Sequence, residues 1–337
     1  MSNKTYTFVS IFTVTFNRRP FIPYLIKCIE QQTYPKDKIE WVICDDGSDP
    51  IKDLVEHLTY VKYFRYDEHL LLGKKRNLMN AHCSGDILVY MDDDDYYPPE
   101  RISHAVDKLT KSDLLIAGSS ELHMYAKNKN KIFKFGPYGP NHATAASFAF
   151  KKQLLNQTKF NDESAFGEEK TFLKEYTIPM IQLDVTKTIL VCAHQHNSID
   201  RESLLEYPEN CKVTSSCYTL DDFFKDDNLK IFYTKNIHGI LNNYELGKKE
   251  HKQEMHKQLN ERIKQTQEKI KNDNLMLENH NKLMLASNQK VEFNNIEKLK
   301  QHYEKRLENN SIIINEMMKK IKTLTTELDN CKKLQNT

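Results

Sequence analysis

The sequence predicts an α/β fold in which a mostly parallel sheet is flanked by helices and followed by a long α-helical tail. Short apolar runs alternate with segments of helical periodicity over residues 7–109, which is typical of parallel strands joined by crossover helices. The strands predicted at 7–16, 39–44 and 87–91 each run directly into polar residues. In open α/β sheets, the ligand binds beside the carboxyl ends of the strands. Residues 248–337 contain neither Gly nor Pro, which is typical of continuous helix.

The elements of the predicted sheet follow one another in order. The run at 7–16 is apolar and β-branched, which favours a buried strand. Pro20 suits the first turn of the next helix, and Phe21, Leu25 and Ile29 share one face of it. The same reasoning predicts strands at 39–44, 61–66 and 87–91, and helices at 75–82 and 99–109.

The composition excludes several classes of protein. A net charge of +2 at pH 7 indicates neither a nucleic-acid coat nor a membrane-surface protein, so we expect no nucleic-acid partner. Seven Cys without a CxxC pair exclude a zinc ribbon and favour reduced thiols over a disulfide scaffold. The sequence has neither a signal-peptide pattern nor a run of about 18 apolar residues, so we expect a cytoplasmic protein without a transmembrane helix.

A change of composition near Glu245 predicts two domains, at residues 1–244 and 245–337. All ten Pro and the only Trp precede this point. In the last part of the tail, apolar residues alternate steps of three and four after one step of seven, with Asn310 in a d position: Leu307, Ile314, Met317, Ile321, Leu324, Leu328 and Cys331. We expect a coiled coil that forms a homo-oligomer or, alternatively, folds back on itself.

Four consecutive carboxylates, Asp92 to Asp95, are the sharpest feature of the sequence. Such groups repel one another unless a cation or hydrogen bonds neutralise them. Because they follow the strand at 87–91, they lie where a ligand is expected, and Mg²⁺ or Mn²⁺ commonly bridges such carboxylates to a diphosphate. The alternative is a solvated acidic turn before the helix that starts near Pro99. The spacing excludes an EF-hand.

A basic segment, Gly73-Lys74-Lys75-Arg76, opens the helix predicted at 75–82. It lacks the first Gly and the Ser or Thr of a P-loop, so that assignment is excluded. A basic helix start still offers positive charge and backbone N–H groups to a phosphate. The alternative is a basic surface turn.

Several motifs, taken as a set, resemble family 2 glycosyltransferases of the GT-A fold. They occur in the order of that family and at compatible spacings: Val9-Ser10-Ile11, Thr15-Phe16-Asn17-Arg18, Gln31-Gln32-Thr33-Tyr34, Trp41 through Ser48, Arg76-Asn77, Gly85-Asp86, and Met91 through Asp95 with Pro99. The resemblance covers residues 6–200 and implies a GT-A sheet. The Lys- and Asn-rich composition is also similar to glycosyltransferases of giant DNA viruses, which would place the protein in the host cytoplasm.

The resemblance implies a nucleotide-sugar donor, usually a uridine diphosphate sugar. Phe16 would lie against the base, and the adjoining Asn17 and Arg18 would also contact the donor. Asp46, or its neighbour Asp45, would accept a hydrogen bond from the edge of the base.

The same resemblance assigns the diphosphate and the metal. Arg76 would contact the base or the diphosphate, and Asp92 and Asp93 would face the ribose and metal-bound water. Asp94 matches the family's direct metal ligand, the last acid of its Asp-x-Asp motif, with Asp92 as a second metal candidate. The implied cofactor is Mn²⁺ or Mg²⁺.

Gly167-Glu168-Glu169, followed by Phe172, resembles the family's Gly-Glu-Asp and aromatic residue. The family's catalytic base falls on Glu169, and Glu168 is the neighbouring candidate. Inverting transfer is one displacement at the anomeric carbon, so a carboxylate must take the acceptor's proton. The alternative is that both acids cap a helix predicted at 170–176.

The segment His194-Gln195-His196-Asn197 follows an apolar run at 188–193, where family members often place a His-x-x-Asn-like segment. We expect His196 to bind the metal, with His194 as the second choice, and only one of the two to reach the site. A structural His is the alternative. His142 is expected on the acceptor side.

The sequence therefore predicts a metal-dependent glycosyltransferase that inverts the anomeric centre and acts on a glycan, protein or small-molecule hydroxyl. A nucleotidyltransferase on a similar sheet is a second class, but Asn17-Arg18-Arg19-Pro20 stands where its Gly-rich loop would be. A catalytically dead domain on a coiled-coil protein is a third, although such a domain has no reason to keep four repelling carboxylates.

Overall fold

The computed structural model describes residues 5–199, 201–206, 212–286, 300–301 and 304. The chain divides into two compact units, of which the first contains Met1–Arg201 and Thr214–Lys252, and the second Glu202–Val213 and Gln253–Thr337. The first unit extends past the predicted boundary at residue 244, because Leu246 and Gly247 accept hydrogen bonds from Asn17 and Arg18.

The main sheet has the strand order β3-β2-β1-β4-β8-β5-β9. The strands β1 (Val9–Thr15), β2 (Ile39–Asp45), β3 (Val61–Arg65) and β4 (Ile87–Tyr90) are parallel, so the predicted parallel sheet is confirmed. The rest of the sheet is mixed. The strand β8 (Ala149–Lys151) runs antiparallel to β4 and to β5 (Ile116–Gly118), and β9 (Ile181–Gln182) is parallel to β5.

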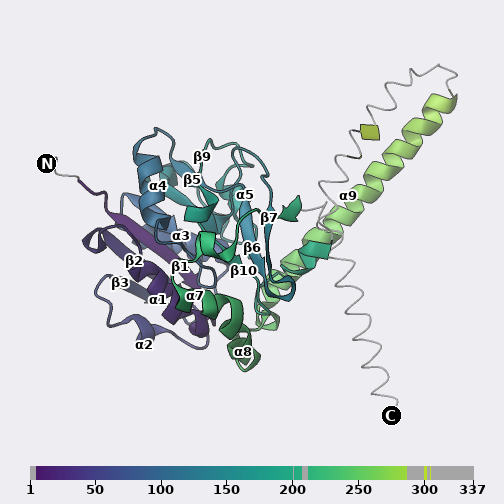
Figure 1. The fold of residues 1–337 in the computed structure, drawn as a ribbon. Helices are drawn as coiled ribbons and strands as arrows, with labels where there is room; N and C mark the ends of the chain where they lie inside the picture. The colour runs from purple at the N-terminus through teal and green to yellow at the C-terminus, as the bar shows by residue number, and fades with distance from the viewer. Residues whose placement is uncertain (1–4, 200, 207–211, 287–299, 302–303, 305–337) are drawn as a thin grey trace, which may run out of the picture. The chain divides into compact units, whose positions relative to one another are not determined.

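The helices of the first half lie where the periodicity predicts them, as Figure 1 shows. The helix α1 (Ile22–Glu30) follows a 3₁₀ turn at Arg19–Phe21 that contains Pro20. The helix α3 (Leu72–His82) packs against β1 and β2, and α4 (Arg101–Thr110) packs against β4, β5 and β8. One core cluster is rich in buried aromatic side chains, namely Phe12, Tyr90, Phe148, Phe150, Phe160 and Phe172.

A smaller sheet has the order β10-β6-β7-β11, with β6 (Leu122–Ala126), β7 (Lys131–Phe135), β10 (Val191–Cys192) and β11 (Val213–Ser215). An isolated bridge between Tyr96 and Leu190 joins the loop after β4 to the chain that enters β10. This bridge brings the acidic loop close to the segment that carries His194 and His196.

Short helical segments fill the remaining connections. They are α2 (Lys52–Val55), α5 (Glu169–Phe172), α6 (Leu220–Phe223), α7 (Asp227–Ile231), a π-helix at Phe232–Asn236, α8 (Ile237–Asn242), and 3₁₀ turns at Lys36–Lys38, Lys127–Lys129, Ala145–Ser147, Lys152–Asn156, Val185–Lys187, Ser203–Glu206, Glu245–Gly247 and Lys249–His251. The helix predicted at 170–176 is shorter than expected, because Lys174, Glu175 and Tyr176 adopt left-handed φ angles of 48°, 57° and 62°.

In the second unit, α9 (Gln253–Ala286) is one continuous helix, which confirms the predicted helix over this range. The heptad residues from Leu307 to Cys331 lie outside the described residues, so the predicted coiled coil stays a prediction. Among the described helices, none is both long and apolar enough to cross a membrane.

A buried carboxylate ties the first three strands together. The Glu40 side chain accepts hydrogen bonds from the Ser10 hydroxyl and the Ser84 backbone N–H, and pairs with Lys62 at 2.6 Å. Burial alone would raise the pKa of Glu40, but the bonds from Lys62, Ser10 and Ser84 outweigh it and lower this pKa from 4.5.

Replacing Glu40 with Gln is expected to lower the free energy of unfolding at pH 7 by roughly 1–3 kcal/mol, because bonds to a charged acceptor become bonds to a neutral one. The folded pKa is depressed, so this stabilisation is complete above the unfolded value and is lost as the pH falls through the folded value. In urea titrations, the difference from wild type should therefore shrink below about pH 4.5.

The matched control is Glu56→Gln, on an exposed side chain of the same domain, which should change stability by no more than about 0.5 kcal/mol. A Glu40→Gln protein as stable as this control would contradict the role assigned to the network.

Candidate active site

The carboxyl ends of β1, β2 and β4 meet at one edge of the main sheet. Thr15 pairs with Asp45, and the Asp46 N–H donates to the Thr15 carbonyl at 3.4 Å. On the other side of β1, the Met91 N–H donates to the Phe12 carbonyl at 3.0 Å. The three polar clusters that follow these strands therefore gather at one rim, as the sequence predicts.

At the β2 end, both predicted base-binding acids are engaged within the protein. Asp46 accepts hydrogen bonds from Lys75, from His69 at 2.9 Å and from the Leu70 N–H at 2.8 Å. Burial would raise the pKa of Asp46, but these partners outweigh it and lower the pKa. Asp46 therefore shapes this end of the rim by holding His69 and Lys75.

The carboxylate of Asp45 is also fully engaged in hydrogen bonds within the protein. Its carboxylate accepts from the N–H groups of Gly47 and Ile51, both at 2.9 Å, and from the Tyr63 hydroxyl at 2.7 Å. Asp45 thereby fixes the turn after β2.

Phe16 lies beside two residues that Asp46 holds. Its ring centroid is 4.3 Å from that of His69, and the Lys75 ammonium lies 5.5 Å from the ring. Sequence reasoning identified Phe16 but missed His69, which stands in an irregular loop without a motif around it. The two rings, inclined at 50° to each other, form an aromatic pair, here called the aromatic platform, and a single ring face is enough to stack on a planar base.

Arg76, which is buried, connects the acidic loop after β4 to the segment predicted to contain the general base, Glu168-Glu169. The Arg76 Nε lies 2.7 Å from Glu168 Oε1, and Nη2 lies 3.6 Å from Asp92 Oδ1. The guanidinium also packs over the rings of Tyr90 and Phe160, at 4.9 and 5.8 Å from their centroids. Glu168 is therefore committed to Arg76.

The neighbouring acid, Glu169, is less enclosed. It is the first residue of α5 and is half-buried, whereas Glu168 is buried. The preceding Gly167 adopts a left-handed φ of 61°, which turns the chain into the helix. The two glutamates thus have different environments: Glu168 is buried and pairs with Arg76, and Glu169 is half-buried at the start of α5.

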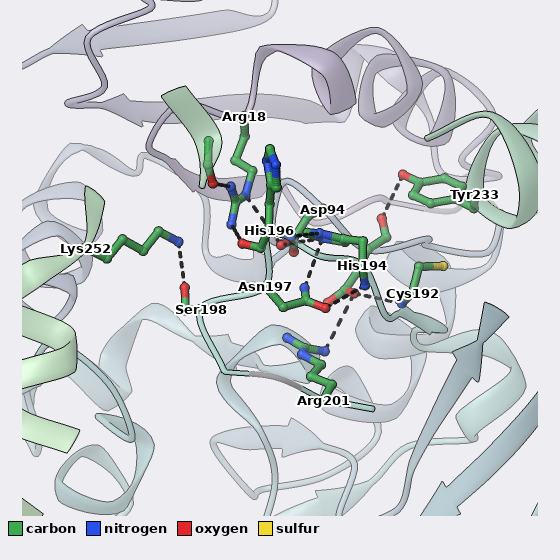
Figure 2. Close-up of polar contacts among 12 residues, drawn as sticks. Arg18, Asp94, Cys192, His194, His196, Asn197, Ser198, Arg201, Tyr233 and Lys252 are labelled. Atoms are coloured by element: carbon green, nitrogen blue, oxygen red, sulfur yellow. Dashed lines mark hydrogen bonds and ion pairs between the residues drawn. The ribbon is translucent and has the colours of Figure 1, made fainter. Parts of the chain in front are cut away.

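Asp94 lies between a histidine and an arginine, as Figure 2 shows. Its Oδ2 is 3.1 Å from His194 Nε2 and 3.6 Å from Arg18 Nε. Burial would raise the pKa of Asp94, but His194 and then Arg18 hold it well below its usual range. Asn197 positions the histidine by accepting from the His194 N–H at 2.8 Å and contacting Nε2 at 2.9 Å.

The last acid of the loop, Asp95, has an anchoring role that sequence reasoning missed. Its carboxylate accepts from the Cys192 N–H at 3.2 Å and lies 3.9 Å from Arg201, while its carbonyl accepts from the Tyr233 hydroxyl at 3.0 Å. Asp93 is also buried, and burial together with Asp94 raises its pKa to about 7. The four acids therefore do not act as one cluster.

The predicted metal residues Asp94, Asp92 and His196 are not gathered around one point. Within the described part of the chain, no three His, Cys, Asp or Glu side chains form a metal-binding group. The structure places His194, the second choice, beside Asp94. His196 lies by Tyr244, with ring centroids 6.3 Å apart, and its ring nitrogens have no hydrogen-bond partner.

Asp94 Oδ2 and His194 Nε2 nevertheless lie 3.1 Å apart. Because His194 Nδ1 accepts from the His196 N–H at 3.2 Å, Nε2 carries the ring proton and would become a metal ligand on losing it. Mg²⁺ and Mn²⁺ in phosphate sites take one or two protein carboxylates and fill their remaining positions with phosphate oxygens and water. The pair fits such an ion when a diphosphate supplies the other ligands.

Residues 244–252, here called the strap, lie against the loop after β1. Arg18 Nη1 donates to the Gly247 carbonyl at 2.8 Å, and Asn17 Nδ2 donates to the Leu246 carbonyl at 3.0 Å. Lys252 Nζ donates to the Ser198 hydroxyl at 2.6 Å. Composition placed residues 245–252 in the tail, because no local pattern reveals contacts such as those of Leu246 and Gly247 with residues 229 positions earlier.

The acceptor-side prediction concerns His142. Its ring lies between Tyr138 and Tyr176, at centroid distances of 4.9 and 4.8 Å. Burial lowers the pKa of His142 to about 4, so this ring is neutral at physiological pH.

Comparison with known proteins gives one family match. Residues 10–170 match the family described as Glycosyl transferase family 2. An uncharacterized glycosyltransferase of Rickettsia conorii is 24% identical over 270 residues, which cover 72% of this chain. The match covers 44% of that relative's length.

The comparison with solved structures also returns glycosyltransferases. The mannosyltransferase PcManGT from Pyrobaculum calidifontis, in complex with GDP-Man and Mn²⁺, is 13% identical with a TM-score of 0.50, covering 94% of this chain and 88% of that one. TarS 1–349 from S. aureus, in complex with UDP-GlcNAc, is 18% identical with a TM-score of 0.45, covering 55% and 58%.

Replacing Arg76 with Met should destabilise the protein by roughly 3–5 kcal/mol, because it leaves Glu168 and Asp92 without their buried cation. The free energy of unfolding from urea titration measures this change. Adding Glu168→Gln should restore part of the loss, because the second change removes one of the unpaired charges.

The same substitution at an exposed arginine is the control. Arg19 pairs with Asp53 through two bonds at 2.9 and 2.6 Å, yet the two side chains are 32% and 59% exposed. Arg19→Met should cost no more than about 1 kcal/mol. Equal losses at the two sites would refute the buried network.

Proposed function

We propose, from the premise that residues 10–170 form a family 2 glycosyltransferase domain, that the protein transfers a sugar from a nucleotide-sugar donor to an acceptor hydroxyl. The transfer inverts the anomeric centre and depends on a divalent metal ion. The observation that carries this proposal is the Asp94–His194 pair at the rim where three strands end beside an aromatic platform. The motifs around Phe16 and Asp46 favour a uridine diphosphate sugar.

The donor site divides along the rim. At the β2 end, the aromatic platform of Phe16 and His69 would contact the base through one of its rings. Asp94 and His194 would hold Mn²⁺ or Mg²⁺, whose charge offsets the negative charge that develops on the leaving diphosphate. Arg18 and Arg76 add fixed positive charge on either side of Asp92 and Asp94.

Glu169 is the general base of the proposed reaction. The acceptor oxygen forms a bond to the anomeric carbon while the bond from that carbon to the diphosphate oxygen breaks. The hydroxyl proton passes to the Glu169 carboxylate. Glu168 is less suited to this task because its carboxylate is paired with Arg76 at 2.7 Å.

The nucleotidyltransferase alternative gains no support from the loop after β1. That loop binds the strap through Asn17 and Arg18 and carries no Gly-rich phosphate cradle.

Replacing Asp94 with Asn is expected to abolish the metal-dependent part of donor binding. Asn keeps the shape but removes the charge that attracts the cation. The measurement is the rise in thermal midpoint on adding UDP, with and without MnCl₂. Asp107→Asn, which alters an exposed helical ion pair with Lys111, is the control. Wild-type metal dependence in the Asp94→Asn protein would disprove the assignment.

Replacing Glu169 with Gln should lower the rate of sugar transfer by roughly 10²–10⁴, because the amide cannot take a proton. Affinity for UDP should survive. Glu168→Gln serves as the comparison, and its main effect should be on stability, since it weakens the bond to Arg76. A stable Glu168→Gln protein without transfer activity, beside an active Glu169→Gln protein, would move the base to Glu168.

A further inference from the structure

We infer that the strap, which lies outside the family-matched residues 10–170, forms part of the donor site, and that the Lys252 ammonium contacts the donor's diphosphate. This inference rests on the proposed function. It adds a cation that the family match does not include.

The strap is fixed to the rim at several points. Arg18 and Asn17 donate to consecutive strap carbonyls, those of Gly247 and Leu246. The Tyr244 hydroxyl donates to Asp49 at 2.8 Å, beyond the β2 end. The strap therefore extends from the turn after β2, at Asp49, to the loop that follows His196, at Ser198.

Gly247 allows the strap to sit this close. A Cβ atom there would lie 2.7 Å from His196 Nδ1 and 2.8 Å from the Asn17 carbonyl oxygen, both below the closest approach that carbon atoms tolerate. The position of the strap thus depends on a residue without a side chain.

Lys252, the last residue of the strap, is half-buried and faces the loop that follows His196. Figure 2 shows its side chain reaching Ser198. Burial and the charge of Arg18 lower the pKa of Lys252 to about 7, while Asp94 and Asp93 oppose that shift. The bond to Ser198 holds the ammonium against the segment that carries His194 and His196.

The pairing of the rim cations distinguishes Lys252 from the others. Arg18 pairs with Asp94, Lys75 with Asp46, and Arg76 with Glu168. In the part of the chain that the structure describes, Lys252 has no carboxylate in ion-pair contact and donates to a neutral hydroxyl. A half-buried ammonium with this partner is incompletely compensated, so an anionic ligand would stabilise it.

His196 provides a second, independent observation of unsatisfied polar groups at this place. Its side chain is enclosed, with 1% of the residue exposed, and both ring nitrogens lack a hydrogen-bond partner. The His196 ring packs against the strap at Gly247, where a Cβ atom would lie 2.7 Å from Nδ1. His196 lies two residues before Ser198, the hydrogen-bond partner of Lys252, so unpaired ring nitrogens and an incompletely compensated cation occur on the same segment. These are the expected surroundings of a ligand with several acceptor oxygens.

A diphosphate fits these surroundings better than a neutral group does. It brings several acceptor oxygens and negative charge, and its charge increases as the bond to the sugar breaks. Lys252 therefore contributes to binding the nucleoside diphosphate. Its contribution is larger in the transition state than in the ground state, because the charge on the diphosphate is larger there.

The test compares Lys252→Met with Lys248→Met in the full chain. Both changes replace an ammonium on the strap, but Lys248 is engaged with Glu245 at 2.7 Å. Dissociation constants for UDP, GDP, UMP and GMP are measured by calorimetry with MnCl₂. Lys252→Met should weaken binding of the preferred nucleoside diphosphate by about 10- to 100-fold, with a much smaller effect on its monophosphate.

The readout is the ratio of diphosphate to monophosphate affinity, which a purely structural lysine would not change. Wild-type affinity for the diphosphate in the Lys252→Met protein overturns the inference. So does an equal loss for diphosphate and monophosphate together with a lower thermal midpoint, because that result makes Lys252 structural. Lys252→Arg, which keeps the charge, should recover part of the diphosphate affinity.

Gly247→Ala tests the strap separately. Its Cβ should displace the strap from Asn17 and His196 and weaken diphosphate binding while leaving Lys252 in the sequence. Unchanged diphosphate affinity in this variant would refute the role of the strap. A wild-type protein that binds neither UDP nor GDP would instead refute the proposed function itself.

Discussion

The neutralisation of four adjacent carboxylates after β4 governs the arrangement of the rim. Like charges so close together in a buried loop are unstable unless each finds its own compensation. Three of the acids have different partners, and burial together with Asp94 raises the pKa of the fourth, Asp93, to about 7. Asp92 faces Arg76, Asp94 faces Arg18 and His194, and Asp95 bonds to the chain at Cys192.

Each compensating group also fixes a distant segment. Arg76 couples the acidic loop to Glu168 and therefore to the start of α5, where Glu169 stands. Arg18 couples the same loop to the strap, through the Gly247 carbonyl, and to the His196 carbonyl. The charges that stabilise the fold at this edge thus also set the positions of the proposed base and metal ligands.

This arrangement separates residues that look equivalent in the sequence. Glu168 is held by a buried cation, whereas its neighbour Glu169 is half-buried at the first turn of a helix. The Asp95 carboxylate accepts from the Cys192 N–H and fixes the loop, whereas the Asp94 carboxylate lies beside the His194 ring nitrogen. Among the rim cations, Lys252 differs from Arg18, because Arg18 already pairs with a carboxylate and Lys252 donates to a hydroxyl.

The sequence by itself determined the parallel sheet, its first helices and the rim where polar residues gather, because hydrophobic periodicity and strand ends are local properties. Only the tertiary structure placed His194 rather than His196 beside Asp94, bonded Asp95 to the Cys192 N–H, and brought His69 to Phe16. It also moved the strap from the tail into the first unit. These outcomes depend on contacts between residues far apart in the chain, and local composition carries no information about such contacts.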